Sequence, residues 1–173
     1  MNSTVRRFSI PLFLSLSLFP TGCAYYSFTG ATVPAHLNTV AIPLAEDNSL
    51  SPLTTLDDEL TDLLITRFVQ QTRLSLEQNE DAADAVLTVR IDRYANAPTS
   101  VSGRERAELN RITLSVSVRY YDRVEDKELL QRTFSSFADY DPLEGGLERE
   151  EETARAALEN IADDIFTAAT SNW

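Results

Sequence analysis

Cys23 has the clearest reactive chemistry in this chain, because it directly follows a short apolar segment and Gly22. Arg6 and Arg7 precede the apolar run 8–19, which is typical of a signal peptide and is shorter than the roughly 20 residues that a membrane-spanning helix needs. Cys23 is the only cysteine, so an internal disulfide is excluded. The pattern predicts removal of residues 1–22 as a lipoprotein signal peptide and acylation of Cys23.

The alternative is a secreted protein that keeps a free thiol at Cys23. Pro20 and Thr21 depart from the usual Leu-(Ala/Ser)-(Gly/Ala)-Cys signal, and only Gly22 and Cys23 match it well. Ala24 follows the cysteine, and the absence of aspartate there resembles lipoproteins that are sent to an outer membrane. We therefore expect an outer-membrane, lipid-anchored protein on the periplasmic side, with residues 23–37 as its tether and 38–173 as one domain.

A second group of residues offers binding chemistry. Removal of Arg6 and Arg7 leaves 13 basic residues, and nine of these lie between Arg90 and Arg132. A guanidinium forms paired hydrogen bonds to phosphate or carboxylate that a lysine cannot reproduce. The candidate ligand- or partner-binding residues are Arg90, Arg104, Arg106, Arg111, Arg119 and Tyr121.

Charge and composition exclude several functions. The mature chain has 27 acidic against 13 basic residues, a net charge of −14, which argues against nucleic-acid binding because that function needs a basic surface. His36 is the only histidine, and it has no cluster of cysteines or further histidines around it as a metal site would require. We expect no enzyme activity, no catalytic residue, no metal and no cofactor.

The hydrophobic patterns predict six elements in the order β-α-β-β-β-α. The expected strands are 38–45, 85–94, 112–121 and 129–138, with a possible short pairing at 74–76, and the expected helices are 56–72 and about 148–169. Residues 95–111 are expected to form a long loop. These elements predict a single α+β domain, in which two helices pack on one face of an approximately four-stranded, mostly antiparallel sheet.

The strand at 112–121 has the cleanest pattern, because Ile112, Leu114 and Val116 alternate with Thr113, Ser115 and Ser117. One face of the sheet should therefore be core and the other polar. The polar face is expected to carry Thr88, Arg90, Asp92, Thr113, Ser115, Ser117, Arg119 and Tyr121. It is either a plain solvated face, as in many antiparallel sheets, or a docking surface for a polar partner or an anionic ligand.

In the strand at 129–138, Phe134 and Phe137 differ in parity, which predicts a bulge or a strand end.

Several segments resemble a known family. YSFTG at 26–30, LNRIT at 109–113 and the terminal pair Asn172 and Trp173 are similar to the LptE family of lipopolysaccharide-assembly lipoproteins, in the form found in the Bacteroidetes and their relatives. The resemblance extends over essentially all of the mature chain. It implies a helix-on-sheet fold, an anchor in the outer membrane, no enzyme activity, and a role as the plug partner of the large β-barrel LptD in lipopolysaccharide export.

Two functions remain open at this stage. The first is a binding subunit that plugs or assembles an LptD-like barrel and contacts lipopolysaccharide through the Arg-rich middle of the chain. The second is a stand-alone periplasmic carrier of a lipid or glycolipid, which would need an enclosed apolar cavity of several hundred cubic ångströms. Two helices and one sheet rarely enclose such a cavity, so we favour the first.

Overall fold

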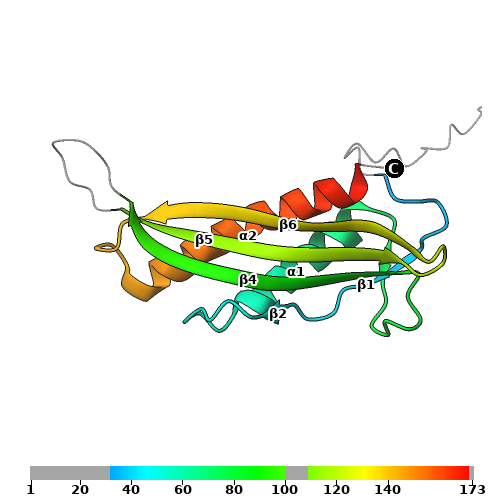
Figure 1. Ribbon diagram of the computed structural model, residues 1–173, viewed down its shortest axis with the longest axis horizontal. Coiled ribbons are helices and arrows are strands. Elements are labelled where there is room, and N and C mark those ends of the chain that lie inside the picture. The colour runs from blue at the N-terminus through cyan, green and yellow to red at the C-terminus, as the bar shows by residue number, and fades with distance from the viewer. Residues whose placement is uncertain (1–31, 100–108, 172–173) are drawn as a thin grey trace, which may run out of the picture.

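Three long strands form an elongated sheet, and both helices lie behind one of its faces (Figure 1). The computed structural model describes residues 32–99 and 109–171. The predicted signal peptide, Cys23, Arg104, Arg106 and the two terminal residues lie outside these ranges. The elements are β1 (Thr39–Ala41), β2 (Glu46–Asp47), α1 (Leu56–Gln71), β3 (Ser75–Leu76), β4 (Ala85–Thr99), β5 (Leu109–Asp122), β6 (Lys127–Tyr140) and α2 (Gly146–Thr170).

The sheet is mixed and six-stranded, which corrects the predicted four-stranded, mostly antiparallel sheet. Its strand order is β3-β1-β4-β5-β6. β2 pairs with the same edge of β4 as β1 does, a few residues further along β4. β4, β5 and β6 are antiparallel to one another, whereas the pairings β1–β3, β1–β4 and β2–β4 are parallel. Of the strand predicted at 38–45, only Thr39–Ala41 forms a strand, and it ends before Pro43, whose backbone lacks the N–H that a sheet ladder needs. β2 lies just beyond the predicted range. The pairing predicted at 74–76 is confirmed as β3.

The alternation predicted for 112–121 is confirmed. Ile112, Leu114 and Val116 are fully buried, and Val118 and Tyr120 continue this face of β5. The side chains between them lie on the opposite face and are intermediate or exposed. The hydrophobic core therefore lies on one side of the sheet only.

The two helices supply the other half of this core. Leu60, Leu64 and Phe68 of α1 are fully buried, as the predicted helical stripe requires. Phe68 packs edge-on against Tyr120 of β5 at 5.8 Å and against Phe166 of α2 at 5.4 Å between ring centroids. α2 buries the predicted C-terminal stripe, which includes Ala157, Leu158, Ile161 and Ile165. The described residues form a single α+β domain, with both helices packed on one face.

The long strands extend beyond their predicted ends. β4 continues to Thr99 and β5 begins at Leu109, so much of the predicted loop at 95–111 belongs to an antiparallel pair. β6 is also longer than 129–138 and has its irregularity opposite Tyr120 and Tyr121, near its start. No register shift separates Phe134 from Phe137: Phe134 faces the core opposite Val116, and Phe137 lies on the other face opposite Thr113.

Within the described ranges, neither helix is apolar enough over a sufficient length to cross a membrane.

Candidate functional site

The sheet surface opposite the helices, called the open face below, is the first candidate site. Its centre is built from hydroxyl side chains that pair across β5 and β6. Ser115 lies 3.1 Å from Ser135, and Ser117 lies 3.2 Å from Thr133, measured between side-chain oxygens. Such cross-strand pairs stabilise a sheet and leave a polar surface of short side chains. The open face is therefore accessible to a partner that offers hydrogen-bonding groups.

A β-bulge shapes the β4 part of the open face. The register between β4 and β5 shifts between Ile91 and Arg93, so Asp92 has no residue directly opposite it. Arg90, Asp92 and Arg93 consequently lie on the same side of the strand. Asp92 accepts hydrogen bonds from Arg90 Nε at 2.7 Å and from the Ser117 hydroxyl. Burial raises the pKa of Asp92, but these two hydrogen bonds and the Arg90 charge outweigh it and hold the pKa below its usual value.

The described candidate residues from the sequence all lie on this face, but they do not form a patch of free positive charge. Arg111 donates two hydrogen bonds to Asp139, at 2.7 and 2.8 Å. Arg119 pairs with Glu128 at 3.2 Å and lies over the Tyr121 ring, whose hydroxyl donates to Asp126. Each predicted arginine that the structure describes thus has a carboxylate partner, as Arg90 has in Asp92. Sequence reasoning found the positions and missed the partners, because Asp139 and Glu128 belong to another strand.

A shallow hollow of about 680 Å³ lies over this part of the sheet. Its lining comes from β2, β4, β5 and β6 and is mostly polar, including Glu46, Thr88, Arg90, Ser117, Arg119, Gln131 and Thr133. Lipid chains bind in apolar cavities that exclude water. The hollow therefore suits a polar surface and does not suit acyl chains.

The aromatic side chain of Phe137 marks the part of the open face near the end of β4 and the start of β5. Phe137 is half exposed, and the Arg111 guanidinium lies 3.9 Å from the centre of its ring. A cation above an aromatic face is attracted by the ring quadrupole. Arg111 is therefore held by both Asp139 and Phe137, so its position is fixed before any partner arrives.

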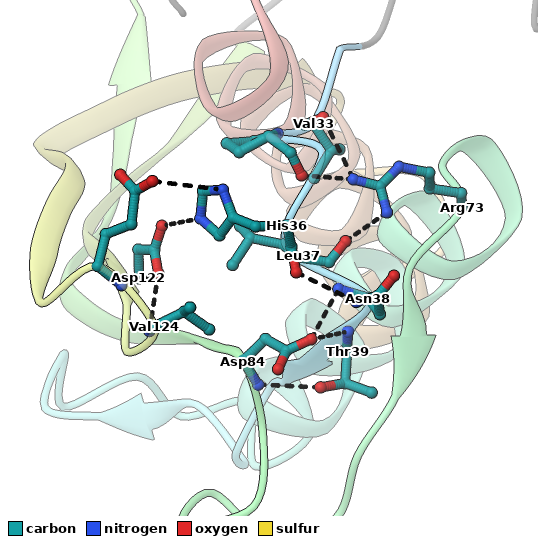
Figure 2. A network of polar contacts seen from close by, with 11 residues as sticks. Val33, His36, Leu37, Asn38, Thr39, Arg73, Asp84, Asp122 and Val124 are labelled. Atoms are coloured by element: carbon teal, nitrogen blue, oxygen red, sulfur yellow. Dashed lines mark hydrogen bonds and ion pairs between the residues drawn. The ribbon is translucent and has the colours of Figure 1, made fainter.

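A second polar network surrounds His36 (Figure 2). His36 Nε2 lies 2.5 Å from the buried Asp122 carboxylate, and Nδ1 lies 3.6 Å from Glu125. The three residues form the one cluster of possible metal ligands within the described ranges. However, the two carboxylates face different ring nitrogens, and both nitrogens of one imidazole cannot bind the same ion. This geometry favours a structural bridge rather than a metal centre.

The His36 network was not predicted, since Asp122 is 86 residues away in sequence. Asp122 accepts hydrogen bonds from the backbone N–H groups of Val124 and Glu125, both at 2.9 Å, as well as contacting His36. Burial raises the pKa of Asp122, but the hydrogen bonds from the Glu125 backbone, His36 and the Val124 backbone together hold the pKa below its usual value. The folded structure thus stabilises the ionised form of Asp122.

Known proteins supply one matching family and several similar folds. A family model described as LptE, lipopolysaccharide-assembly, matches residues 37–169. A minor lipoprotein from Acinetobacter baumannii is similar at a TM-score of 0.50 with 16% identity, over 77% of this chain and 93% of that chain. The PelC dodecamer from Paraburkholderia phytofirmans is similar at a TM-score of 0.51 with 12% identity, over 82% and 95% of the two chains.

A homolog of a neuraminyllactose-binding hemagglutinin from Helicobacter pylori reaches a TM-score of 0.56 with 10% identity, over 85% of this chain and 93% of that chain. No curated protein matches the chain. Because these identities are all well below 25%, the similarities to solved structures show a shared fold and nothing further.

Proposed function

The chain belongs to the LptE family of lipopolysaccharide-assembly proteins, and on that premise we propose that it is the non-catalytic plug subunit of an LptD-type outer-membrane barrel. In this role it is anchored to the periplasmic side of the outer membrane through an acylated Cys23. It helps the barrel to insert lipopolysaccharide into the outer membrane. The family is described as one of lipopolysaccharide assembly, which supports a role in binding.

The open face carries this proposal. One side of the sheet is covered by α1 and α2, and the other presents Ser115, Ser117 and Thr133 with paired charges around them. The interior of a membrane β-barrel is lined by polar side chains, because lipid-facing and lumen-facing residues alternate along each strand. A polar sheet surface is complementary to such a lining and would leave few groups without hydrogen-bond partners.

Direct contact with lipopolysaccharide is a further part of the proposal, and it is limited by the existing ion pairs of the open-face arginines. Its phosphates would meet Arg90, Arg111 and Arg119, each of which is already paired with a carboxylate. A phosphate would have to displace Asp92, Asp139 or Glu128 from its arginine, against the net negative charge of the chain. We therefore assign the open face primarily to the barrel and only secondarily to the glycolipid.

The alternative role as a stand-alone glycolipid carrier receives no support from the open face. A carrier must shield acyl chains from water, which requires an enclosed apolar cavity. The hollow over β4, β5 and β6 is shallow and lined mostly by polar side chains. It matches a protein surface better than a lipid.

Photo-crosslinking in intact cells tests the proposed interface. A photoreactive residue replaces Thr133, which is exposed on the open face, or Asn160, which is exposed on α2 and serves as the matched control. We expect position 133 to capture a large barrel protein and position 160 to capture much less. Capture at position 160 in preference to 133 would contradict docking through the open face.

A further inference from the structure

We propose that residues 32–38, called the strap below, hold one end of the domain toward the lipid surface. The strap joins the domain to the segment that begins at Cys23. This inference rests on the lipid attachment in the proposed function. It adds to that function an orientation of the domain relative to the lipid surface. The orientation arises because the strap is bound to the domain at several points and is not a free tether.

Arg73, which follows α1, makes the first set of contacts. Its guanidinium donates hydrogen bonds to the backbone carbonyls of Leu37 and Pro34, and reaches the carbonyl of Val33 at 3.5 Å (Figure 2). A guanidinium presents its donors in a rigid planar fork, so a single side chain holds three backbone carbonyls of one short segment at once. The Leu37 side chain is fully buried in the core, which prevents the strap from sliding.

Two carboxylates hold the other side of the strap. Asp84, just before β4, accepts hydrogen bonds from the backbone N–H groups of Asn38 at 2.7 Å and Thr39 at 3.0 Å. These backbone hydrogen bonds hold the pKa of Asp84 below its usual value. Asp122, at the end of β5, holds the imidazole of His36. Figure 2 shows the His36 ring directed at Asp122 and the strap backbone directed at Asp84.

The beginning of the strap is attached to the end of α2. The Thr32 backbone N–H and its hydroxyl both donate to the Thr170 carbonyl, at 3.0 and 2.9 Å. The last carbonyls of a helix lack partners within the helix, so Thr32 satisfies one of them. The strap thus contacts the ends of α1, α2 and β5 and the start of β4, all at one end of the molecule (Figure 1).

The chain length outside the structure limits how this end is placed. Eight residues, 24–31, separate Cys23 from Thr32, and even fully extended they reach only about 30 Å. β4 alone has 15 residues, which at about 3.3 Å per residue makes the sheet about 50 Å long. An inverted, upright domain, with the opposite end of the sheet at the membrane, would hold Thr32 about 50 Å from the lipid, which is beyond this reach. Of the two upright orientations, only the one in which the strap end faces the lipid is therefore compatible with the chain length.

Charge does not provide this orientation. The β5–β6 turn at the strap end carries exposed Arg123 and Lys127 beside exposed Glu125 and Asp126, so these charges balance and give an anionic lipid surface no net attraction. Attachment of the chain must therefore position the domain. A full-length Cys23→Ala protein should accordingly show no binding to vesicles that contain phosphatidylglycerol.

Energy transfer from two single labels measures the orientation. The lipidated chain is placed in vesicles that carry an acceptor dye on the lipid headgroups, and a thiol-reactive donor is attached at Val124→Cys or Leu143→Cys. Both positions are exposed, at 57% and 90%, and β6 separates them along its whole length. Acylation uses the thiol of Cys23, so each label is unique. We expect transfer to be severalfold more efficient from position 124, and equal or reversed efficiencies would overturn the orientation.

Variants of Arg73 and Arg67 test whether the contacts between Arg73 and the strap produce the orientation. Arg73→Gln should reduce the difference in transfer between the two labels, whereas Arg67→Gln, which affects an ion pair between α1 and Asp163, should leave it unchanged. Hydrogen exchange on the same full-length chain should be about tenfold or more faster at Leu37 and Asn38 in Arg73→Gln, because local opening becomes easier.

The outcomes separate the two proposals. Exchange at Leu37 and Asn38 as fast in the unmodified chain as in an unstructured peptide would overturn the strap whatever happens at Cys23. A chain whose mass shows no acyl group would overturn the anchor of the proposed function and the membrane orientation with it. A lipidated chain with equal transfer from both labels would overturn only the orientation.

Discussion

Asp122 links the strap to the β5–β6 turn. Its side chain is fully buried, and it accepts hydrogen bonds from two backbone N–H groups while contacting His36. A buried carboxylate is tolerated only when its lone pairs are satisfied in this way. Asn would keep the shape of Asp122 but would lose the charge, so Asp122→Asn isolates the electrostatic contribution.

We predict that Asp122 makes the fold acid-sensitive. Its pKa in the folded chain lies below the value of about 3.9 in an unfolded chain, so ionised Asp122 stabilises the fold above about pH 4. This contribution is lost as the pH falls through the folded-state pKa. Urea unfolding between pH 7 and pH 2 should show a larger loss in the free energy of unfolding for the parent chain than for Asp122→Asn. Asp164→Asn, on the exposed side of α2, should behave like the parent. Equal losses in the parent and Asp122→Asn would contradict the prediction.

Arg111 shows how to separate an internal ion pair from a binding residue. Arg111 and Asp139 form a two-bond pair on the open face. We predict that Arg111→Glu slightly lowers the melting temperature, and that the exchanged double variant Arg111→Glu with Asp139→Arg restores it, because exposed pairs contribute little to stability. Barrel capture, measured by co-purification, should stay reduced in the double variant if Arg111 itself contacts the partner. If the double variant captured the barrel as well as the parent chain does, Arg111 would have a purely structural role.

Among the elements, β5 was the easiest to predict and β4 the hardest. The alternation in β5 is a local pattern, since one face packs on the helices and the other stays polar. The bulge at Asp92 changes which residues of β4 face the core, yet nothing in the local sequence marks it. Likewise, β1 and β2 pair with a strand more than 40 residues further along the chain, so their parallel pairing could not be read from their own residues.

The face assignment of β5 leads to a prediction about folding. Leu114 is fully buried against the helices, whereas the neighbouring Ser115 lies on the open face. Leu114→Asp should unfold the domain, because an unpaired buried carboxylate costs several kcal/mol out of the roughly 5 to 15 kcal/mol that stabilises a typical domain. Ser115→Asp should remain folded. Circular dichroism during heating checks both variants, and similar melting temperatures would refute the two-faced description of the sheet.

At the scale of the whole molecule, the sequence predicted a two-helix, one-sheet domain and the positions of the open-face arginines. The missing parts depend on contacts between distant segments. His36 was recognised only as a lone histidine near the tether, since its partner Asp122 is 86 residues away. Arg73 could not be assigned to the strap either, because its acceptors are backbone carbonyls, which have no sequence signature.

The last prediction concerns the attachment of the whole domain. Among the described residues, the buried hydrophobic core begins at Leu37, so Cys23→Ala should leave the melting temperature unchanged. The same variant should move from the membrane to the soluble fraction, because acyl chains at about 0.8 kcal/mol per buried methylene are the main source of membrane affinity. Fractionation is done in cells that lack the barrel partner, since a bound barrel would retain the domain independently. If the Cys23→Ala protein still sedimented with the outer membrane in those cells, acylation of Cys23 would not be what anchors the domain.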